Sequence, residues 1–381
     1  MRDRKPAEVF PPGEYIKEEI DSRGWTQNDL AEILGRPTRL INELISGKRG
    51  ITPETAKGLA GAFGTSAQFW MNLESIYRLF LNVTQHDIVE RRAALYAKAP
   101  VRAMIRRNWI EQSNNIDILE STICSFFNAR NINEDFHFSP FAARKSTSQA
   151  DLTIEQNAWL FRALHMARAV HSNTFSKSKF EEALRQIKLL LFEPAEIRKI
   201  PRILSACGIR FIIIEALPQS KIDGAAFWLE NTPVVALSLR YDRIDYFWYT
   251  FMHELGHVKN EDGKGNENIA LDVDLEGETK RSQDGRDYER LADNFASNFL
   301  VSQKELNDFI ARIRPLYSKG KIVGFANRIK IHPGIVVGQI HYREKNYSHF
   351  REFLIKIRHI IINETISDGW GSPYPTFSKE A

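Results

Sequence analysis

A five-residue motif has the residue types and the spacing of a metal-dependent hydrolase. The sequence His-Glu-Leu-Gly-His occupies residues 253–257, and its hydrophobic lead-in, Tyr246–Met252, predicts a buried helix. Residues four apart lie on one helix face, about 5–6 Å apart at Cβ, so His253 and His257 can both reach one zinc ion at about 2.0–2.1 Å. Glu254 projects beside that ion. We predict that it is the general base for a water molecule whose pKa zinc lowers toward ~7.

A catalytic zinc also needs a third protein ligand and an open fourth position. Glu289 is the candidate, because Glu289 and Asp293 are spaced to share one face of a helix. One of them can bind the metal while the other accepts a hydrogen bond from the far nitrogen of a ligating histidine, and we assign the second role to Asp293. Further acidic residues after the motif compete for the third ligand, although a solvated acidic loop is the preferred interpretation: Asp262, Glu267, Asp272, Asp274, Glu276 and Glu278.

Other chemically active residue types lack comparable spacing. His332 precedes Pro333 and could stabilise a charged intermediate, but a helix cap or turn is the preferred interpretation. The two cysteines, Cys124 and Cys207, form no disulfide framework and are predicted to be buried in a protein of the reducing cytoplasm. The chain has no G-x-S-x-G, P-loop or dinucleotide-binding glycine motif. The remaining histidines are predicted to be structural or solvated: His86, His137, His165, His171, His341, His349 and His359.

The elements around the metal motif are a mixture of helices and short strands. Strands are expected at Ile209–Ile214 and Val234–Leu239, with a turn at Lys221–Gly224 between them. The motif helix begins near Asp242, and a second helix resumes near Tyr288. We also expect an exposed connection over residues 262–287, a last helix over residues 350–362 and a loose tail from Trp370 onward.

The first 82 residues predict five short helices with no sheet. N-cap residues, first-turn prolines and terminal glycines place them at residues 14–23, 27–34, 37–46, 53–63 and from residue 66 onward. The tight turn through Gly35 joins the second and third helices in the outline of a helix-turn-helix. The second helix of such a unit lies in the DNA major groove with its N-terminal residues near base edges.

The third helix and its flanks carry side chains that suit DNA. Arginine pairs with guanine and asparagine with adenine in the major groove, and phosphates are held from the helix flanks. The balance of charge in residues 1–80, 11 basic against 11 acidic, leaves a helical interaction module as the alternative. The predicted base-edge residues are Arg36, Thr38, Arg39, Asn42 and Glu43, and the predicted phosphate contacts are Gln27, Lys48 and Arg49. A basic cluster either extends this footprint or forms a solvated helix face: Arg91, Arg92, Lys98, Arg102, Arg106 and Arg107.

Length and composition are those of a globular protein with more than one domain. The chain has 381 residues, of which 43% are hydrophobic and 26% charged, which excludes a disordered or fibrous protein and predicts two or three domains. No stretch approaches the ~20 apolar residues of a membrane span, and the polar N-terminus lacks a secretory signal. The net charge of +4 permits an anionic partner without requiring one.

Two parts of the chain resemble known families. Residues 11–79 resemble the HigA-type antitoxins of the Xre helix-turn-helix class, on Pro12–Glu14, Thr26–Ala31, Ile41–Glu43, Gly47–Ala56, Phe63–Ser66 and Phe69–Leu73. Residues from about 180 to 345 resemble the ImmA/IrrE family of zinc metallopeptidases, on Phe227–Trp228, Pro233–Val235, His253–His257, Glu289–Ala296 and His332–Gly338. The predicted division is a DNA-binding domain at 1–82, a helical connector at 83–179, the metallopeptidase domain at 180–345 and a C-terminal helix and tail at 346–381.

These resemblances imply a fold and a function. The first implies an all-α, λ-repressor-like domain that binds double-stranded operator DNA as a homodimer. The second implies an α+β, zincin-like domain with a small sheet, zinc on His253, His257 and Glu289, Glu254 as base, and cleavage of a regulatory protein. Candidate substrates are a repressor, a toxin-associated protein and the chain itself near residues 131–151. The alternatives are a non-proteolytic regulator or antitoxin whose zinc domain senses a ligand or docks a partner such as a toxin, and a helical scaffold with a structural metal.

Overall fold

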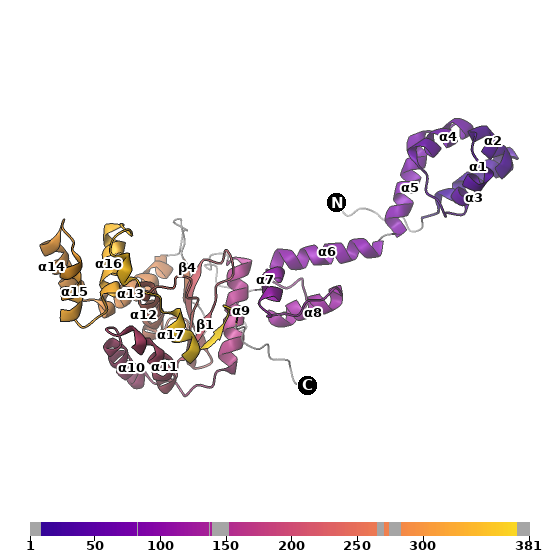
Figure 1. The fold of residues 1–381 in the computed structure, drawn as a ribbon. Helices are drawn as coiled ribbons and strands as arrows, with labels where there is room; N and C mark the ends of the chain where they lie inside the picture. Colours follow the sequence, from indigo (N-terminus) through magenta and orange to yellow (C-terminus); the bar gives the residue numbers. More distant parts are fainter. Residues whose placement is uncertain are drawn as a thin grey trace. The chain divides into compact units, whose positions relative to one another are not determined.

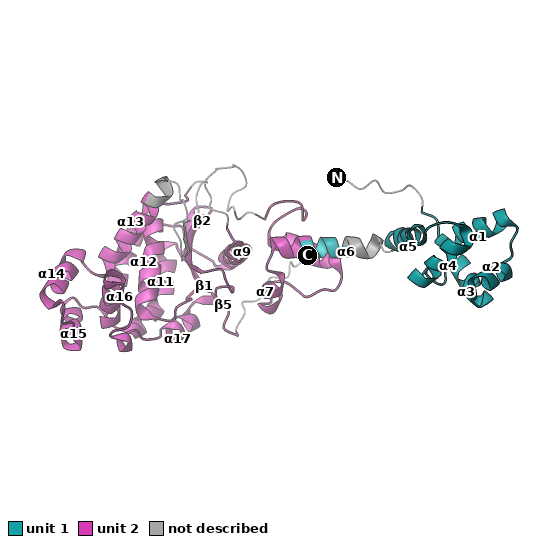
Figure 2. Ribbon diagram, turned by 90° about the horizontal axis from the view of Figure 1, so that it is seen from above, with its two compact units in different colours: residues 1–93 teal, residues 94–381 magenta. Residues whose placement is uncertain are grey.

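The computed structural model of the chain forms two compact units, residues 1–93 and 94–381, coloured teal and magenta in Figure 2. Among the described residues, no helix has both the length and the apolar composition that crossing a membrane requires. The structure describes residues 9–81, 83–136, 138, 152–264, 270–273 and 283–371.

The N-terminal unit is entirely helical over its described residues, as predicted. Its buried apolar side chains come from five helices and from Ile51, between the third and fourth of them, and form one core, in which Leu30, Ile41 and Trp70 are fully buried. The helices are α1 (Pro12–Arg23), α2 (Gln27–Leu34), α3 (Thr38–Ile45), α4 (Pro53–Phe63), α5 (Ala67–Leu81) and α6 (Val83–Lys98), which runs across the boundary into the second unit.

Local signals fix the helix ends in this unit. Thr26 and Asp29 form a complete capping box: the Asp29 N–H donates to Thr26 Oγ1 over 3.2 Å, and the Thr26 N–H donates to Asp29 Oδ2 over 2.7 Å. Gly35 ends α2 at a φ of 58°, in the left-handed region that glycine adopts without strain. Pro37 is the N-cap of α3 rather than its first residue, so this helix begins one residue later than predicted.

The C-terminal unit is built on a five-stranded mixed sheet, which confirms the predicted combination of helices and a small sheet. The spatial order is β4-β2-β3-β1-β5. Strand β1 pairs in parallel with β3 and β5, whereas β2 pairs antiparallel with β3 and β4. The strands are β1 (Arg210–Ile214), β2 (Ile222–Leu229), β3 (Thr232–Leu237), β4 (Ala270–Val273) and β5 (Ile366–Asp368).

Alternate side chains of the sheet enter two different cores. In β1, Phe211 and Ile213 face the core shared with α12, whereas Ile212 and Ile214 face the core shared with α9. Figure 1 shows these two helices on opposite sides of the sheet. The second core also takes side chains from α7 and α8, which lie in the segment that we predicted to be a connector.

The remaining helices of this unit surround the two cores. Those after α6 are α7 (Val101–Arg106), α8 (Ile116–Phe126), α9 (Ile154–Ala169), α10 (Lys177–Leu189), α11 (Ile200–Cys207), α12 (Ile244–Asn260), α13 (Gln283–Leu300), α14 (Gln303–Ile313), α15 (Lys319–Arg328), α16 (Pro333–Glu344) and α17 (Arg358–Ile361). Short 3₁₀ helices occupy η1 (Pro194–Lys199), η2 (Arg351–Phe353) and η3 (Ile362–Glu364).

Three sequence predictions for this unit are wrong. The expected turn at Lys221–Gly224 is instead the start of β2, all of whose residues are buried. The expected helix over residues 350–362 is broken, because Asp242 Oδ1 accepts the backbone N–H groups of Ile357 and Arg358 over 2.9 and 2.8 Å. The expected exposed connection after residue 262 contains β4 and the first residues of α13.

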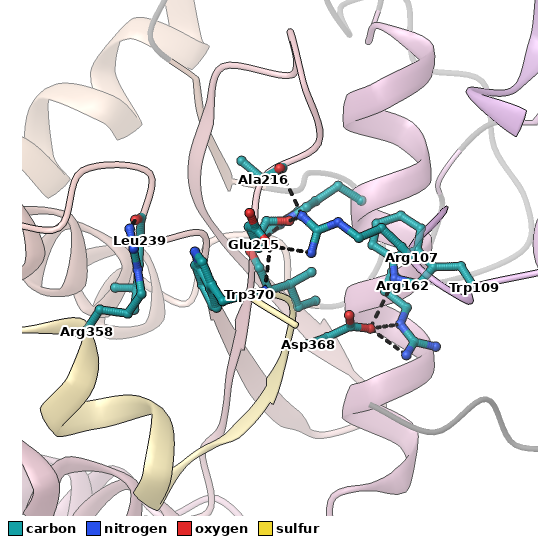
Figure 3. A network of polar contacts seen from close by, with 11 residues as sticks. Arg107, Trp109, Arg162, Glu215, Ala216, Leu239, Arg358, Asp368 and Trp370 are labelled. Atoms are coloured by element: carbon teal, nitrogen blue, oxygen red, sulfur yellow. Dashed lines mark hydrogen bonds and ion pairs between the residues drawn. The ribbon is translucent and has the colours of Figure 1, made fainter. Parts of the chain in front are cut away.

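A buried polar network holds the C-terminal strand against α9 (Figure 3). Arg162 Nε and Nη2 each lie 2.5 Å from Asp368 Oδ2, and Trp109 Nε1 donates to the same oxygen over 3.1 Å. Asp368 is fully buried. Burial raises the pKa of Asp368, and the opposing effect of Arg162 is smaller. Beside this group, Glu215 Oε2 lies 2.7 Å from Arg107 Nη1 and accepts the Trp370 N–H over 2.7 Å.

Candidate metal centre and nucleic-acid interface

Two adjacent helices bring the predicted ligands together. His253 and His257 lie on α12 and are 3% and 1% exposed, and Glu289 lies on α13. One ligand atom from each residue lies within 4.8 Å of the other two. The two Nε2 atoms are 3.0 Å apart, and Glu289 Oε2 lies 3.3 Å from Nε2 of His253 and 4.0 Å from Nε2 of His257.

These separations fit a zinc ion. A tetrahedral ion with bonds of about 2.0–2.1 Å separates its ligand atoms by about 3.3 Å. The three donor separations in this cluster are 3.0, 3.3 and 4.0 Å, so one equals that value and the other two lie below and above it. Two imidazoles and one carboxylate are also a donor set that zinc takes in hydrolytic enzymes, leaving a fourth position for water or substrate. His253, His257 and Glu289 therefore fit the ion that the sequence predicted.

The far nitrogen of His253 is held by Asp293, the residue that we predicted for this role. His253 Nδ1 lies 3.0 Å from Asp293 Oδ1, and the hydroxyl of Tyr249 donates to the same oxygen over 2.8 Å. Burial raises the pKa of Asp293, but the hydrogen bond and charge of His253, the hydrogen bond from Tyr249 and the charge of His257 together outweigh it, so the net shift is downward. Tyr249 was not predicted, although its position four residues before His253 places it on the same helix face.

The far nitrogen of His257 is held by Asp262. Asp262 Oδ2 lies 2.8 Å from His257 Nδ1, and the aspartate side chain is only 8% exposed. From the sequence we expected Asp262 to lie in a solvated acidic loop. That expectation is wrong, because its side chain is buried against His257. Of the other acidic residues considered as ligands, Asp272 lies in β4 with its side chain outside the described residues. Glu267, Asp274, Glu276 and Glu278 lie outside them altogether.

Glu254 is fully buried between α12 and the sheet. A Cβ atom built on Gly224 of β2 would lie 2.5 Å from Glu254 Oε1 and 3.0 Å from its Cγ, so a larger residue at position 224 would force this carboxylate to shift. Gly256 has a related role, because a Cβ there would lie 3.0 Å from Ala292 Cα in α13. The two glycines thus let a strand and a helix approach the motif helix closely.

His332 and the cysteines have structural environments. His332 is the N-cap of α16, and its Nδ1 accepts the N–H of Gly334 over 3.1 Å, which confirms the helix-cap interpretation. Burial lowers the pKa of this histidine. Cys124 and Cys207 are both buried and unbridged, as predicted. Burial raises the pKa of Cys207 to about 11, which makes it a poor nucleophile.

The predicted DNA-contacting residues lie around α3. Six of the eight are exposed, and Thr38 and Glu43 are half-buried. An open hollow of about 510 Å³ lies beside the turn between α2 and α3, with Arg36 and Thr38 in its lining. The exposed residues are Gln27, Arg36, Arg39, Asn42, Lys48 and Arg49.

Ion pairs orient several of these side chains. Arg39 Nε donates to Glu43 Oε1 over 2.8 Å while its side chain stays 88% exposed, and this hydrogen bond lowers the pKa of Glu43. Arg49 lies 3.5 Å from the other oxygen of Glu43. Glu43 therefore faces two arginines of its own domain, an arrangement that suits an orienting residue better than a direct contact with DNA.

The basic cluster after residue 90 is only partly a surface feature. Arg107 pairs with Glu215 and donates to the carbonyl oxygens of Glu215 and Ala216, within the C-terminal unit. Lys98 donates to the carbonyl oxygens of Ile132 and Glu134 over 2.7 and 2.9 Å. These two side chains bind the protein itself, so the predicted cluster of six is smaller than the sequence indicated.

Two family models match this chain in separate regions. Residues 16–70 match the helix-turn-helix family, and residues 207–343 match a peptidase family described as the IrrE N-terminal-like domain. The second match contains His253, His257, Glu289 and the strands β1, β2 and β3. The chain belongs to the helix-turn-helix regulators through its N-terminal part and carries an IrrE N-terminal-like domain after it, which confirms both resemblances seen in the sequence.

Curated relatives match the N-terminal part. The uncharacterized HTH-type transcriptional regulator YddM of Escherichia coli (strain K12) is 31% identical over 68 residues, which cover 18% of this chain and 72% of that protein. Virulence-associated protein I of Dichelobacter nodosus is 39% identical over 69 residues, which cover 18% of this chain and 64% of that protein. The chain thus spans less than two thirds of the length of this second relative.

Solved structures also match this part of the chain. An addiction module antidote protein of the HigA family from Coxiella burnetii is 34% identical, with 20% of this chain and 86% of that chain covered and a TM-score of 0.20. The Pseudomonas aeruginosa antitoxin HigA, solved with the higBA promoter, is 32% identical, with 20% of this chain and 90% of that chain covered and a TM-score of 0.20.

Proposed function

We propose that this chain is a DNA-binding transcription regulator fused to a zinc metallopeptidase that cleaves a regulatory protein. The observation that carries the enzymatic part is the convergence of the Nε2 atoms of His253 and His257 with Glu289 Oε2, while the far side of each imidazole is held by a carboxylate. Glu254, between the two histidines in sequence, supplies a buried carboxylate beside this cluster.

The mechanism divides the work among these side chains. Zinc, when bound, supplies a Lewis acid that polarises water and the peptide carbonyl. Glu254 takes the proton of the attacking water and returns it to the leaving amine, as a general base and then a general acid. Gly224 and the burial of Glu254 keep its carboxylate in one position. Asp293 holds His253 with Nε2 directed at the other ligand atoms.

The DNA-binding part rests on the exposed side chains around α3. Arg39 and Asn42 have the chemistry to pair with guanine and adenine edges, and both are exposed. Gln27, Lys48 and Arg49 are exposed at the flanks, where phosphate contacts are made. A homodimer would read two half-sites of an operator, and the match of residues 16–70 to the helix-turn-helix family supports DNA as the ligand.

The test of peptidase activity compares new protein N-termini in cells that express the wild type or Glu254→Gln. We expect termini that form only with the wild type, since glutamine cannot accept the proton. Zinc content of the two purified proteins is the control and should be equal. Identical sets of termini, under several stresses, would contradict peptidase activity and favour a regulator whose zinc domain senses a ligand or docks a partner.

The test of DNA binding starts by selecting an operator from random double-stranded DNA with the wild-type chain. Arg39→Ala and Asn42→Ala should each weaken binding to the selected site by about 1–3 kcal/mol and relax the base preference at one position. Lys48→Ala should weaken binding to all DNA sequences alike and reduce the salt dependence of binding. Arg78→Ala, on α5, is the matched charge control. Unchanged base preference in the Arg39 and Asn42 variants would refute the recognition-helix assignment.

A further inference from the structure

The motif helix ends in a turn that brings the chain back beneath its second histidine. Glu261, the C-cap of α12, has a φ of 59°, a left-handed conformation that residues other than glycine adopt at some cost. The N–H of Asp262 donates to the carbonyl oxygen of His257 over 3.0 Å. This turn returns Asp262 to the end of the motif helix, where its side chain meets Nδ1 of His257 and not the Nε2 atom that faces His253 and Glu289.

Contacts from the sheet hold this turn in place. Trp228, in β2, donates its indole N–H to the carbonyl oxygen of Asp262 over 2.9 Å. Lys264 lies 5.0 Å from the centre of the Trp228 ring and pairs with Glu261 over 2.9 Å. The backbone of Asp262 is therefore fixed from both sides, and its side chain is almost fully buried against the imidazole.

We infer that Asp262 is the positioning residue of His257, as a counterpart to Asp293 on His253. The inference rests on the proposed zinc site. A carboxylate 2.8 Å from Nδ1 of His257 favours the tautomer with the proton on Nδ1, which leaves the Nε2 lone pair for the metal. It also fixes the rotation of the ring, so that Nε2 points at Glu289 and His253 rather than into the core.

The two supports differ in a way that predicts their relative importance. Asp293 is half exposed and shares one oxygen between His253 and Tyr249. Asp262 is 8% exposed, and its Oδ2 faces the ring of His257. Water can replace the carboxylate of Asp293 more easily than that of Asp262. The zinc site should therefore depend more strongly on Asp262.

The experiment compares zinc affinity in the full-length wild type and three variants, by competition with a chromophoric chelator. Asp262→Ala should weaken zinc binding about 10–100-fold, the usual effect of removing a carboxylate behind a ligating histidine. Asp262→Asn keeps the shape of the side chain and a hydrogen-bond acceptor, so it should lose less zinc affinity than Asp262→Ala. Asp308→Asn makes the same change of charge at an exposed position on α14, outside the turn that holds Asp262, and should leave the affinity unchanged.

Two further readouts separate positioning from a structural role. The unfolding midpoint of each metal-free variant is measured with and without zinc, and the absorption spectrum of the cobalt-substituted protein reports the geometry of the ligands. A smaller zinc-dependent rise in the midpoint and an altered cobalt spectrum are expected for Asp262→Ala. Equal midpoint losses with and without zinc, in both Asp262 variants, would overturn the inference.

The outcomes also distinguish this inference from the proposed function. Stoichiometric zinc in the wild type together with wild-type affinity in Asp262→Ala would overturn the role of Asp262 and leave the zinc site standing. A wild type that binds no zinc would overturn the site itself, and the role of Asp262 with it.

Discussion

Replacing Arg162 with methionine tests how the C-terminal strand is held to the rest of its unit. Arg162 is 4% exposed and is the charged partner of Asp368, which is fully buried in β5. The substitution keeps a long apolar side chain but leaves the carboxylate with Trp109 as its remaining hydrogen-bond donor among the residues that the structure describes. Removal of one partner of a buried ion pair costs about 3–5 kcal/mol, because the other charge stays buried without compensation.

The size of this loss should depend on pH. Burial already raises the pKa of Asp368, and loss of Arg162 raises it further. Between the pKa of the unfolded chain, about 3.9, and this raised value, the folded state binds a proton that the unfolded state does not. Stability then falls as pH rises, so the stability that the Arg162→Met variant loses relative to the wild type should be smaller at pH 5 than at pH 8.

The assay is denaturant unfolding of the full chain followed by tryptophan fluorescence, at both pH values. Trp109 and Trp159 are buried in the same core as α9 and report on its unfolding. Adding Asp368→Asn should recover most of the lost stability at pH 8. Arg185→Met, which breaks an exposed pair with Glu182, is the control and should cost less than about 1 kcal/mol. A loss under about 1 kcal/mol for Arg162→Met, equal at both pH values, would refute the reasoning.

Three other predictions follow from single positions. Gly224→Ala should move the Glu254 carboxylate by about 1 Å, because the new Cβ would lie 2.5 Å from Oε1, and should lower the cleavage rate about 10²-fold while zinc content is retained. A cleavage rate equal to that of the wild type would contradict this prediction. Gly13→Ala should destabilise the N-terminal unit by about 1–3 kcal/mol in thermal unfolding, because the new Cβ would meet the backbone oxygens of Leu44 and Ile45. Gly61→Ala is the control and should not destabilise the unit, because the space around Gly61 is open. Burial and nearby arginines lower the pKa of His165 from 6.5 to about 4, so the unfolded chain alone takes up a proton between these values and stability should fall as pH drops through this range. The difference of 6.5 − 4 = 2.5 corresponds to about 3 kcal/mol at most, and His165→Gln should flatten the pH dependence; a profile that does not change would argue against a buried neutral imidazole.

The helices of the N-terminal unit could be predicted because their boundaries depend on residues close in sequence. Thr26 with Asp29, and Gly35 after α2, are signals that act within one helical turn. The sheet was harder to predict because its pairing is long-range. Strand β5 pairs with β1 from about 150 residues further along the chain. The predicted turn at Lys221–Gly224 overlaps the start of β2, which is a strand because β3 and β4 pair with it.

The candidate site divides in the same way. The spacing of His253 with His257, and of Glu289 with Asp293, follows the helix repeat and could be predicted from the sequence. The closeness of the two helices could not, because it depends on packing at positions such as Gly256. The position of Asp262 under His257 depends on a left-handed turn and on Trp228 in β2, neither of which has a short-range sequence signal.

The most direct test of the central claim is the zinc stoichiometry of the purified full-length chain, measured by equilibrium dialysis. The account predicts one zinc ion per chain in the wild type and in Glu254→Gln, and its loss in His257→Ala and Glu289→Ala. A wild-type chain without zinc, or a His257→Ala variant that retains it, would contradict the assignment of His253, His257 and Glu289 as one metal centre.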